Sequence, residues 1–401
     1  MREMKDSGVE WIGEIPKEWK ICRLKNYAYI MNGADFKDIQ DDNGDYPVIG
    51  SGGEFDRATK YLYDGESVLL GRKGTIDKPR YINGTFWTVD TMYYTKIKDI
   101  GIAKYLYYLC TQIQFDYYQY GSAVPSMTQR DLNSVVFPLP EIVEQENIVN
   151  YLDSKCSKID EIIEKQQAII EKLKEYKISI ITEAVTSGIN PDVEMKDSGS
   201  VWFGSIPINW EMKRLKYVFH IQKDIAGEEG HTVLSITQRG IIPKDFSNNE
   251  GQFANSYANY QLVHKGDFAM NHMDLLTGWV DISKYEGVTS PDYRVFVLKD
   301  KNGMCPEYYL YMMQMCYSAR IFYGLGQGVS GMGRWRLQAD KFLNFHIPIP
   351  PYDEQKIIAD YITDKVNHIE VEIDKRNKLV EKYQEYKKSL IYEVVTGKKE
   401  V

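Results

Sequence analysis

One segment of this 401-residue chain occurs twice, and the repetition constrains the fold more than any other feature of the sequence. The first copy begins at Glu3 and reads EMKDSGVEWIGEIPKEWKICRLK. The second copy begins at Glu194 and reads EMKDSGSVWFGSIPINWEMKRLK. Equivalent residues are 191 positions apart throughout, so Trp19 corresponds to Trp210. A repeat of this kind predicts two copies of one structural unit.

A second repetition follows in each copy, because residues 138–186 match residues 348–396 without a gap at a spacing of 210. The match includes the pairs Glu144-Gln145 and Glu354-Gln355. The difference between 210 and 191 makes the middle of the second copy 19 residues longer than that of the first. Similar flanks therefore enclose two middles that differ in sequence.

The second flank of each copy has the pattern of a long helix. Apolar residues recur every three or four positions, with polar residues at the same two places in both copies, Gln166 and Lys177 in the first and Arg376 and Lys387 in the second. The predicted seam comprises Leu152, Ile159, Ile163, Ile170, Leu173 and Ile180 in the first copy, and Ile362, Ile369, Ile373, Val380, Tyr383 and Leu390 in the second. Such a seam is typical of a coiled coil.

A helix from about residue 144 to 185 would be on the order of 60 Å long at the usual rise per residue. Prolines precede each helix, and Gly188 and Gly397 follow the helices. An ordinary amphipathic helix packed on its own domain is the alternative, but this length would overrun a domain of about 120 residues. The sequence therefore favours two long helices that pack antiparallel on each other.

The two middles, residues 20–140 and 210–350, are rich in Tyr, Gly, Asn and Thr. Short apolar runs such as Ser67–Leu70 and Arg294–Leu298 alternate with turn signals such as Asn43-Gly44. Shorter helices are expected at residues 103–119 and 306–323. The predicted fold class is α+β, with two strand-rich globular domains separated by two long antiparallel coiled-coil helices and related by an internal pseudo-twofold duplication. The predicted division of the chain is 1–140 for the first domain, 141–190 for the central helix, 191–350 for the second domain and 351–401 for the C-terminal helix.

The net charge of −8 argues at first against a nucleic-acid-binding protein. Its distribution weakens that argument, since residues 20–140 hold 14 basic and 14 acidic residues and residues 210–350 hold 15 and 14. Local basic faces on the two middles are compatible with these counts. Weak DNA binding by the isolated chain, and help from a partner, are expected.

The remaining composition predicts a cytoplasmic protein that has no membrane association. Five scattered cysteines without a CxxC pair indicate reduced, buried thiols, and no stretch is apolar enough to span a bilayer.

The sequence motifs of common active sites are absent. The chain has no GxxxxGK[ST] phosphate loop, no GxGxxG and no HExxH. The segment Pro191–Lys196 resembles the carboxylate motif of metal-dependent nucleases, but its spacing is wrong and its Glu194-Met195-Lys196 is the start of the repeat. The Asn/Asp-Pro-Pro-aromatic motif of adenine methyltransferases is missing as well. These observations predict a non-catalytic chain with no metal site.

The chain resembles the specificity subunit of Type I restriction-modification systems. The resemblance covers the whole chain and rests on the repeated MKDSGVEWIGEIPKEW element and on three further segments. These are GESVLLGRKGTIDKPRYINGTFWTVDTMYY from Gly65, FPLPEIVEQENI from Phe137 and IPIPPYDEQKIIADYI from Ile347. The block from Lys265 to Val295 looks like a different subtype of recognition domain, so the two domains are expected to read different DNA sequences.

This resemblance implies a mechanism and a set of partners. Each domain would act as a target recognition domain for one half of a bipartite, asymmetric site in double-stranded DNA, and the helices would set the spacer between the halves. Family members assemble with two methyltransferase subunits and two translocating restriction subunits. No cofactor would be bound by this chain, because S-adenosylmethionine belongs to the methyltransferase subunit.

Candidate DNA contacts were selected for side chains and glycines that suit phosphates or base edges. In the first domain they are Arg72, Lys73, Gly74, Thr75, Lys78, Arg80, Thr128, Gln129 and Arg130. In the second they are Gln238, Arg239, Asn271, His272, Arg334, Arg336 and Gln338. The alternative for each charged member is an ordinary solvated surface residue.

Two other functional hypotheses compete with this one. A tandem coiled-coil adaptor that binds proteins or glycans would explain the acidic net charge well. A self-sufficient methyltransferase or nuclease would need the motifs that the sequence lacks.

Overall fold

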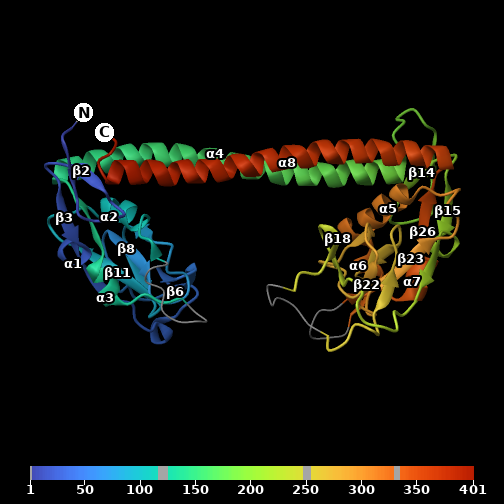
Figure 1. Cartoon of the computed structure of the whole chain (residues 1–401), viewed down its shortest axis with the longest axis horizontal. Coiled ribbons are helices and arrows are strands. Elements are labelled where there is room, and N and C mark those ends of the chain that lie inside the picture. The colour runs from blue at the N-terminus through green and yellow to red at the C-terminus, as the bar shows by residue number, and fades with distance from the viewer. Residues whose placement is uncertain (1, 116–124, 247–253, 329–334) are drawn as a thin grey trace. The chain divides into compact units, whose positions relative to one another are not determined.

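The computed structural model of the chain describes residues 2–115, 125–246, 254–328 and 335–401. It contains two compact units. Unit 1 comprises Met1–Gln167 and Asn377–Val401, and unit 2 comprises Ala168–Arg376. Each unit therefore combines one strand-rich globular part with half of each long helix (Figure 1).

Most of the helical residues belong to two long helices, α4 (Ile142–Ser187) and α8 (Tyr352–Val395). They confirm the two predicted long helices, and α4 extends the expected range 144–185 by two residues at each end. The shorter helices are α1 (Leu24–Tyr27), α2 (Ala103–Cys110), α3 (Gln129–Ser134), α5 (Pro306–Ser318), α6 (Ile321–Leu325) and α7 (Ala339–Asn344), with 3-10 turns η1 (Lys37–Ile39) and η3 (Leu215–Tyr217). Among the helices of the described residues, none is both long and apolar enough to cross a membrane.

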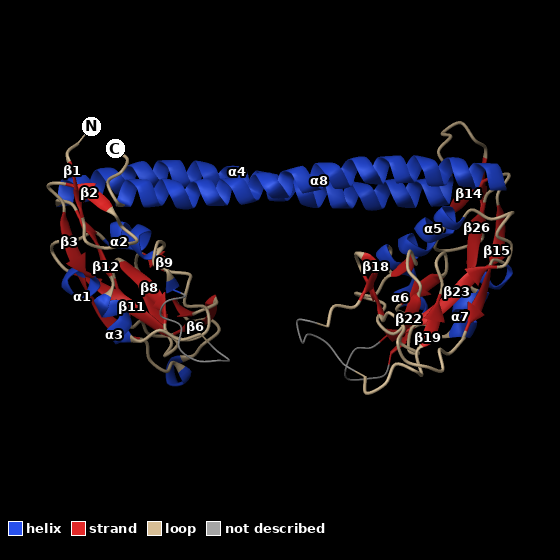
Figure 2. Cartoon of the chain, viewed as in Figure 1, coloured by secondary structure: helices blue, strands red, loops and turns tan. Residues whose placement is uncertain are grey.

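Within each unit, α4 and α8 lie side by side (Figure 2), and the sequence colours of Figure 1 show that they run antiparallel. In unit 1 the Nζ atom of Lys387 lies 2.6 Å from the Asp160 carboxylate, and in unit 2 the Nζ atom of Lys177 lies 2.6 Å from that of Glu370. Adding the repeat spacing of 210 to 160 and 177 gives 370 and 387, so the two ion pairs are repeat equivalents. The polar break at Lys177 and Lys387, which the sequence pattern placed in the seam, thus pairs α4 with α8 in both units.

The predicted seam forms the contact between the helices. Nine of its twelve members are buried, namely Leu152, Ile159, Ile163, Ile170, Ile180, Ile362, Ile369, Val380 and Leu390. Leu173, Ile373 and Tyr383 are half-buried. In unit 1 the hydrophobic core of the globular part also includes Leu152, Ile159, Ile163, Val380 and Leu390. In unit 2 the core includes Ile362, whereas Ile170, Ile180 and Ile369 belong to neither core. Each helix pair therefore contributes some of its seam residues to the core of its globular part, and the remaining seam residues pack between the helices.

The globular part of unit 1 is built on a four-stranded antiparallel sheet with the order β4-β11-β8-β9. Its strands are β4 (Ala28–Asn32), β11 (Met92–Ile97), β8 (Ser67–Gly71) and β9 (Arg80–Ile82). A second sheet, β6-β5-β10-β7, contains a parallel pair between β5 and β10. Its strands are β6 (Gly53–Ala58), β5 (Tyr46–Gly50), β10 (Thr85–Thr88) and β7 (Tyr63–Asp64). Two further antiparallel pairs belong to the unit, the hairpin of β1 (Met4–Asp6) with β2 (Glu14–Pro16) and the long-range pair of β3 (Lys20–Arg23) with β12 (Val136–Leu139).

Unit 2 repeats the central sheet, although the sequences of the two middles differ. Its order is β16-β23-β20-β21, with β16 (Phe219–Gln222), β23 (Arg294–Leu298), β20 (Phe268–Met270) and β21 (Val280–Ile282). The repeated flanks form β13 (Met195–Asp197) with β14 (Ser205–Pro207) and β15 (Glu211–Arg214) with β26 (His346–Ile349). The other pairs are β17 (Leu234–Thr237) with β18 (Gly240–Pro243), β19 (Gln261–Val263) with β22 (Gly287–Thr289), and β24 (Gln327–Gly328) with β25 (Trp335–Arg336). The predicted α+β class is confirmed, and the units differ in what is added around a shared sheet.

The repeated flanks have a common structural role at the start of each long helix. The indole Nε1 of Trp19 donates to Glu144 at 2.8 Å, and that of Trp210 donates to Glu354 at 3.0 Å. Gln145 donates to the Pro140 carbonyl, and Gln355 donates to the Pro350 carbonyl. The Trp–Glu bonds therefore join the first flank of each copy to its second, and the glutamines connect the start of each long helix to the proline segment before it.

The shorter predicted helices are confirmed in position but are shorter than expected. Residues 103–119 were predicted to be helical, and α2 ends at Cys110, after which Thr111 and Gln112 form a turn. Residues 116–119 of this prediction lie outside the described residues. The stretch 306–323 contains α5, which ends at Ser318, and the start of α6, which begins at Ile321. Arg320 separates them with a φ of 56°. All five cysteines are free and buried.

Candidate nucleic-acid interface

In unit 1 the structure brings two of the predicted contact segments together. The loop Arg72–Thr75 follows β8, and the segment before α3 lies against it. The backbone N–H of Met127 donates to the Arg72 carbonyl at 3.1 Å, and that of Gly74 donates to the Pro125 carbonyl at 2.9 Å. Gly74 has a φ of +83°, a conformation that residues with a Cβ rarely adopt.

The predicted contact residues in and next to these two segments differ in how far their side chains are exposed. Lys73, Lys78 and Arg130 are exposed, whereas Arg72 and Thr75 are half-buried. The guanidinium of Arg72 lies 6.0 Å from the centroid of the Tyr93 ring. The exposed cationic side chains are long and flexible enough to reach DNA phosphates. Contacts with phosphates position a protein on DNA.

Three other predicted residues of unit 1 make internal hydrogen bonds. Arg80 donates from Nη2 to the Gly52 carbonyl at 3.1 Å, and Gln129 donates to the Ile30 carbonyl. Thr128 caps α3 through its hydroxyl, which accepts a hydrogen bond from the Asp131 N–H. These contacts fix the shape of the loop cluster, so Arg80, Thr128 and Gln129 support the exposed cations.

In unit 2 the predicted residues come from three loops around the edge of the central sheet. Gln238 and Arg239 form the turn between β17 and β18, and Gln238 donates to the Thr277 carbonyl at 3.3 Å. Asn271 and His272 directly follow β20. Arg336 ends β25 and Gln338 precedes α7. Arg334 lies outside the described residues.

A cavity of about 430 Å³ unites several of these residues. His272, Arg336 and Gln338 line it, and the backbone N–H of Leu337 donates to the His272 carbonyl at 2.9 Å. Gln238, Arg239 and Asn271 are not among its described lining residues. The Asn271 side-chain oxygen instead accepts hydrogen bonds from the N–H groups of Met273 and Asp274, so it shapes its own turn.

Sequence reasoning missed two cations of this cavity, Lys223 and Arg294. Lys223 follows β16, and Arg294 is the first residue of β23 and is 5% exposed. The sequence feature that could have indicated a buried Arg294 is its position directly before the apolar run Val295–Leu298. Its charge is buried there, and burial together with the nearby Arg336 lowers the pKa of Arg294 to about 10.

The electrostatics of the cavity determine the state of its histidine. Burial and repulsion from Arg294, Arg336 and Lys223 lower the pKa of His272 to about 3. The imidazole is therefore neutral at pH 7. Its Nδ1 atom is buried and has no hydrogen-bond partner within the described part of the chain.

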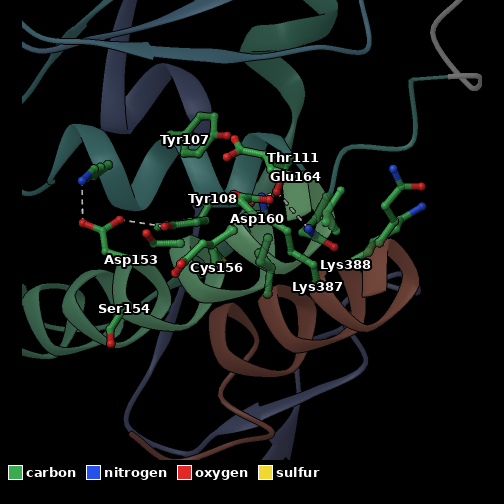
Figure 3. A pocket seen from close by; sticks show the side chains of 17 residues that line it. Tyr107, Tyr108, Thr111, Asp153, Ser154, Cys156, Asp160, Glu164, Lys387 and Lys388 are labelled. Atoms are coloured by element: carbon green, nitrogen blue, oxygen red, sulfur yellow. Dashed lines mark hydrogen bonds and ion pairs between the residues drawn. The ribbon is translucent and has the colours of Figure 1, made fainter. Parts of the chain in front are cut away.

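Unit 1 also contains a groove of about 1220 Å³ between α2, α4 and α8 (Figure 3). Tyr108 donates to Asp153 at 2.7 Å, and Lys104 forms an ion pair with the same carboxylate. Lys387 binds Asp160 across the two long helices. The walls are mainly polar, so this groove suits a protein partner better than an apolar small molecule.

No group of three or more His, Cys, Asp or Glu side chains that could hold a metal occurs among the residues that the structure describes.

The chain matches the family model described as "Type I restriction modification DNA specificity domain" twice, over residues 16–175 and 207–382. It is 24% identical to the Type I restriction enzyme MjaVIII specificity subunit of Methanocaldococcus jannaschii over 433 aligned positions, covering 96% of this chain and 93% of that protein. It is 22% identical to the EcoDI specificity subunit of Escherichia coli over 227 positions, covering 52% and 50%.

A solved structure has a similar fold. That structure concerns complex assembly and conformational transition of the type I R-M system, and its matching chain is 12% identical with a TM-score of 0.66, covering 95% of this chain and 98% of that one. The two separate family matches, one per copy, agree with the internal duplication. The resemblance inferred from the sequence motifs is confirmed.

Proposed function

The chain belongs to the family of Type I restriction-modification specificity subunits, and we propose on this basis that it selects the DNA sequence for a multi-subunit methyltransferase and endonuclease. In this proposal the chain itself is not catalytic. It presents two target recognition domains, one in each unit, to the two halves of a bipartite and asymmetric site in double-stranded DNA.

The observation that carries the proposal is a duplicated scaffold with different side chains at its sheet edges. The four-stranded sheets have equivalent orders in both units, and the repeated flanks attach both to the long helices in the same way. The loops beside the sheets differ, with Lys73 and Arg130 in unit 1 and His272 and Arg336 in unit 2. Different recognition loops on equivalent scaffolds suit a DNA site whose two halves differ in sequence.

The proposed partners are two methyltransferase subunits, which bind S-adenosylmethionine, and two restriction subunits. The duplicated helix pair offers equivalent surfaces to two copies of one partner, which is the expected symmetry for such an assembly. The helices would also set the spacer between the half-sites. A complex with partners explains how a chain with a net charge of −8 could act on DNA.

The test is to co-express the chain with its candidate methyltransferase subunit and to map methylated adenines in genomic DNA by single-molecule sequencing. We expect methylation at one motif with two specified halves and an unspecified spacer. A stable, active complex that methylates without such a motif would refute the proposal.

The acidic net charge favours a second candidate, a tandem adaptor that binds proteins or glycans. Salt dependence separates the two functions. DNA binding by the assembled specificity complex should weaken steeply as salt increases, because phosphate contacts release counterions. An adaptor would show no DNA affinity at any salt concentration.

A further inference from the structure

The cavity of unit 2 has an unusual charge balance. Lys223, Arg294 and Arg336 line it, and none of its described lining residues is Asp or Glu. Lys223 and Arg336 are exposed at its rim, whereas Arg294 is buried in its wall. Positive charge is therefore concentrated in a site whose described lining offers it no acidic counter-charge.

Arg294 is the most informative of these residues, because buried arginines normally pair with a carboxylate. Its Nη2 donates to the Leu337 carbonyl at 2.8 Å, and its guanidinium carbon lies 5.0 Å from the centroid of the Phe342 ring. Among the described residues it forms no ion pair. The neutral contacts hold the side chain in place and leave its charge uncompensated.

His272 adds a neutral hydrogen-bonding group to the same cavity. Its buried Nδ1 is unpartnered within the described residues, and its imidazole remains uncharged at pH 7. In the tautomer that carries a proton on this nitrogen, His272 can donate to an oxygen anion. The apolar side chains of Ile221 and Leu337 also line the cavity.

We propose that this cavity binds one phosphate group, and that in the DNA complex of the proposed function it binds a backbone phosphate of the half-site read by unit 2. Lys223 and Arg336 would make charge-assisted hydrogen bonds to the phosphate oxygens. Arg294, which lies in the cavity wall, would add its positive charge to the binding of the anion. A base edge is a poorer match, because base edges carry no net charge to balance this cluster.

The contact would position unit 2 on DNA without reading sequence. Substituting Lys223 or Arg336 should therefore weaken binding to all sequences equally. It should also reduce the salt dependence of log K by about one phosphate contact, which corresponds to a slope change of roughly 0.9.

The experiment uses the full chain in complex with its methyltransferase subunit and a duplex that contains the mapped motif. Each backbone phosphate in turn is replaced by an uncharged methylphosphonate, and affinity is measured by fluorescence anisotropy. For the unmodified chain, we expect a loss of about tenfold at one or two adjacent phosphates of the unit 2 half-site. Arg336→Gln and Lys223→Gln should weaken binding to the unmodified duplex. For these variants, the methylphosphonate at that position should cause no further loss of affinity.

Lys299→Gln is the matched control, because it removes the same charge from an exposed residue next to the opposite end of β23. Its methylphosphonate profile should equal that of the unmodified chain. Profiles of Arg336→Gln and Lys223→Gln that also equal the unmodified one would overturn the phosphate proposal. A wild-type complex that binds no DNA would instead refute the proposed function.

A second arm distinguishes a DNA phosphate from a free anion. Inorganic phosphate is titrated against the isolated chain, and thermal stability is recorded for the unmodified chain and for Arg336→Gln. Stabilisation that requires Arg336, combined with an unchanged methylphosphonate profile, would show that the cavity takes a free anion and would overturn the DNA assignment.

Discussion

Gln145 and Gln355 occupy equivalent positions in the first turns of α4 and α8, and both side chains are almost completely buried. Besides its bond to the Pro350 carbonyl, Gln355 accepts a hydrogen bond from the Cys305 N–H at 3.0 Å. Gln145 accepts a hydrogen bond from the Ile102 N–H at 3.3 Å. Each glutamine thus connects the start of a long helix to the residue that precedes the α2 or α5 helix.

The first prediction concerns Gln355→Leu. The change keeps the side-chain volume similar but leaves a buried N–H and a buried carbonyl without partners, at about 1 to 3 kcal/mol for each group. We expect the free energy of unfolding to decrease by about 2 to 4 kcal/mol, measured by urea denaturation. Gln167→Leu, at an exposed helical position, is the control and should change it by less than about 0.5 kcal/mol. Equal effects of the two variants would contradict the role assigned to Gln355.

The second prediction concerns pH and His272. The unfolded imidazole titrates near 6.5, and burial beside Arg294, Arg336 and Lys223 lowers the folded pKa to about 3. Between these values the unfolded chain binds more protons, so His272 makes stability decrease as the pH falls below 7. From pH 7 to pH 5 the loss should be at most about 2 kcal/mol. Urea denaturation at both pH values should show this extra loss in the unmodified chain relative to His272→Asn, and identical pH dependence would contradict a buried neutral histidine.

Sequence reasoning at the residue scale identified residue types better than their environments. It selected Arg80 for its charge, yet the side chain holds the Gly52 loop. It omitted Arg294 because one arginine beside an apolar run does not reveal whether its neighbours in space are acidic. Charge compensation depends on contacts between strands that are distant in sequence, and one-dimensional patterns do not contain them.

The long helices are the elements that the sequence predicted best. A stripe repeated over many turns depends only on local periodicity, and the burial of most seam residues agrees with it. Strand positions such as Ser67–Leu70 were also predictable, because short apolar runs end at turn residues. The pairing order of the sheets was not, since it joins segments such as β4 and β11 that lie far apart in the chain.

The third prediction tests the seam. Ile163 is 9% exposed, and Ile163→Asp would place a charge in an apolar contact, so we expect a loss of about 3 kcal/mol in the free energy of unfolding and failure to assemble with partners. Ile373→Asp should have a smaller effect on stability, because Ile373 is only half-buried. Val371→Asp is the control, since Val371 is 55% exposed and lies on α8, the helix that contains Ile373. Thermal unfolding followed by circular dichroism measures all three, and comparable stability of Ile163→Asp and Val371→Asp would refute the seam.

At the scale of the whole molecule, the duplication predicted two units but not how the chain composes them. Unit 1 combines the first residues with the last, and Gly397 shows how close they come. A Cβ on Gly397 would lie 2.4 Å from Pro16, and the glycine has a φ of +72°. The Tyr392 hydroxyl donates to the Trp11 carbonyl at 3.0 Å. These contacts arise because α8 runs antiparallel to α4. The seam pattern predicted that the helices pack on each other, and the two ion pairs between them show which residues lie opposite one another.

Exchanging one recognition domain tests whether each unit reads one half of a bipartite DNA site. Residues 210–350 would be replaced by the equivalent block of another family member, and methylated adenines would be mapped for the original and the exchanged complex. We expect one half of the motif to change while the other half stays the same. Changes in both halves, or an unaltered motif from an active exchanged complex, would contradict it.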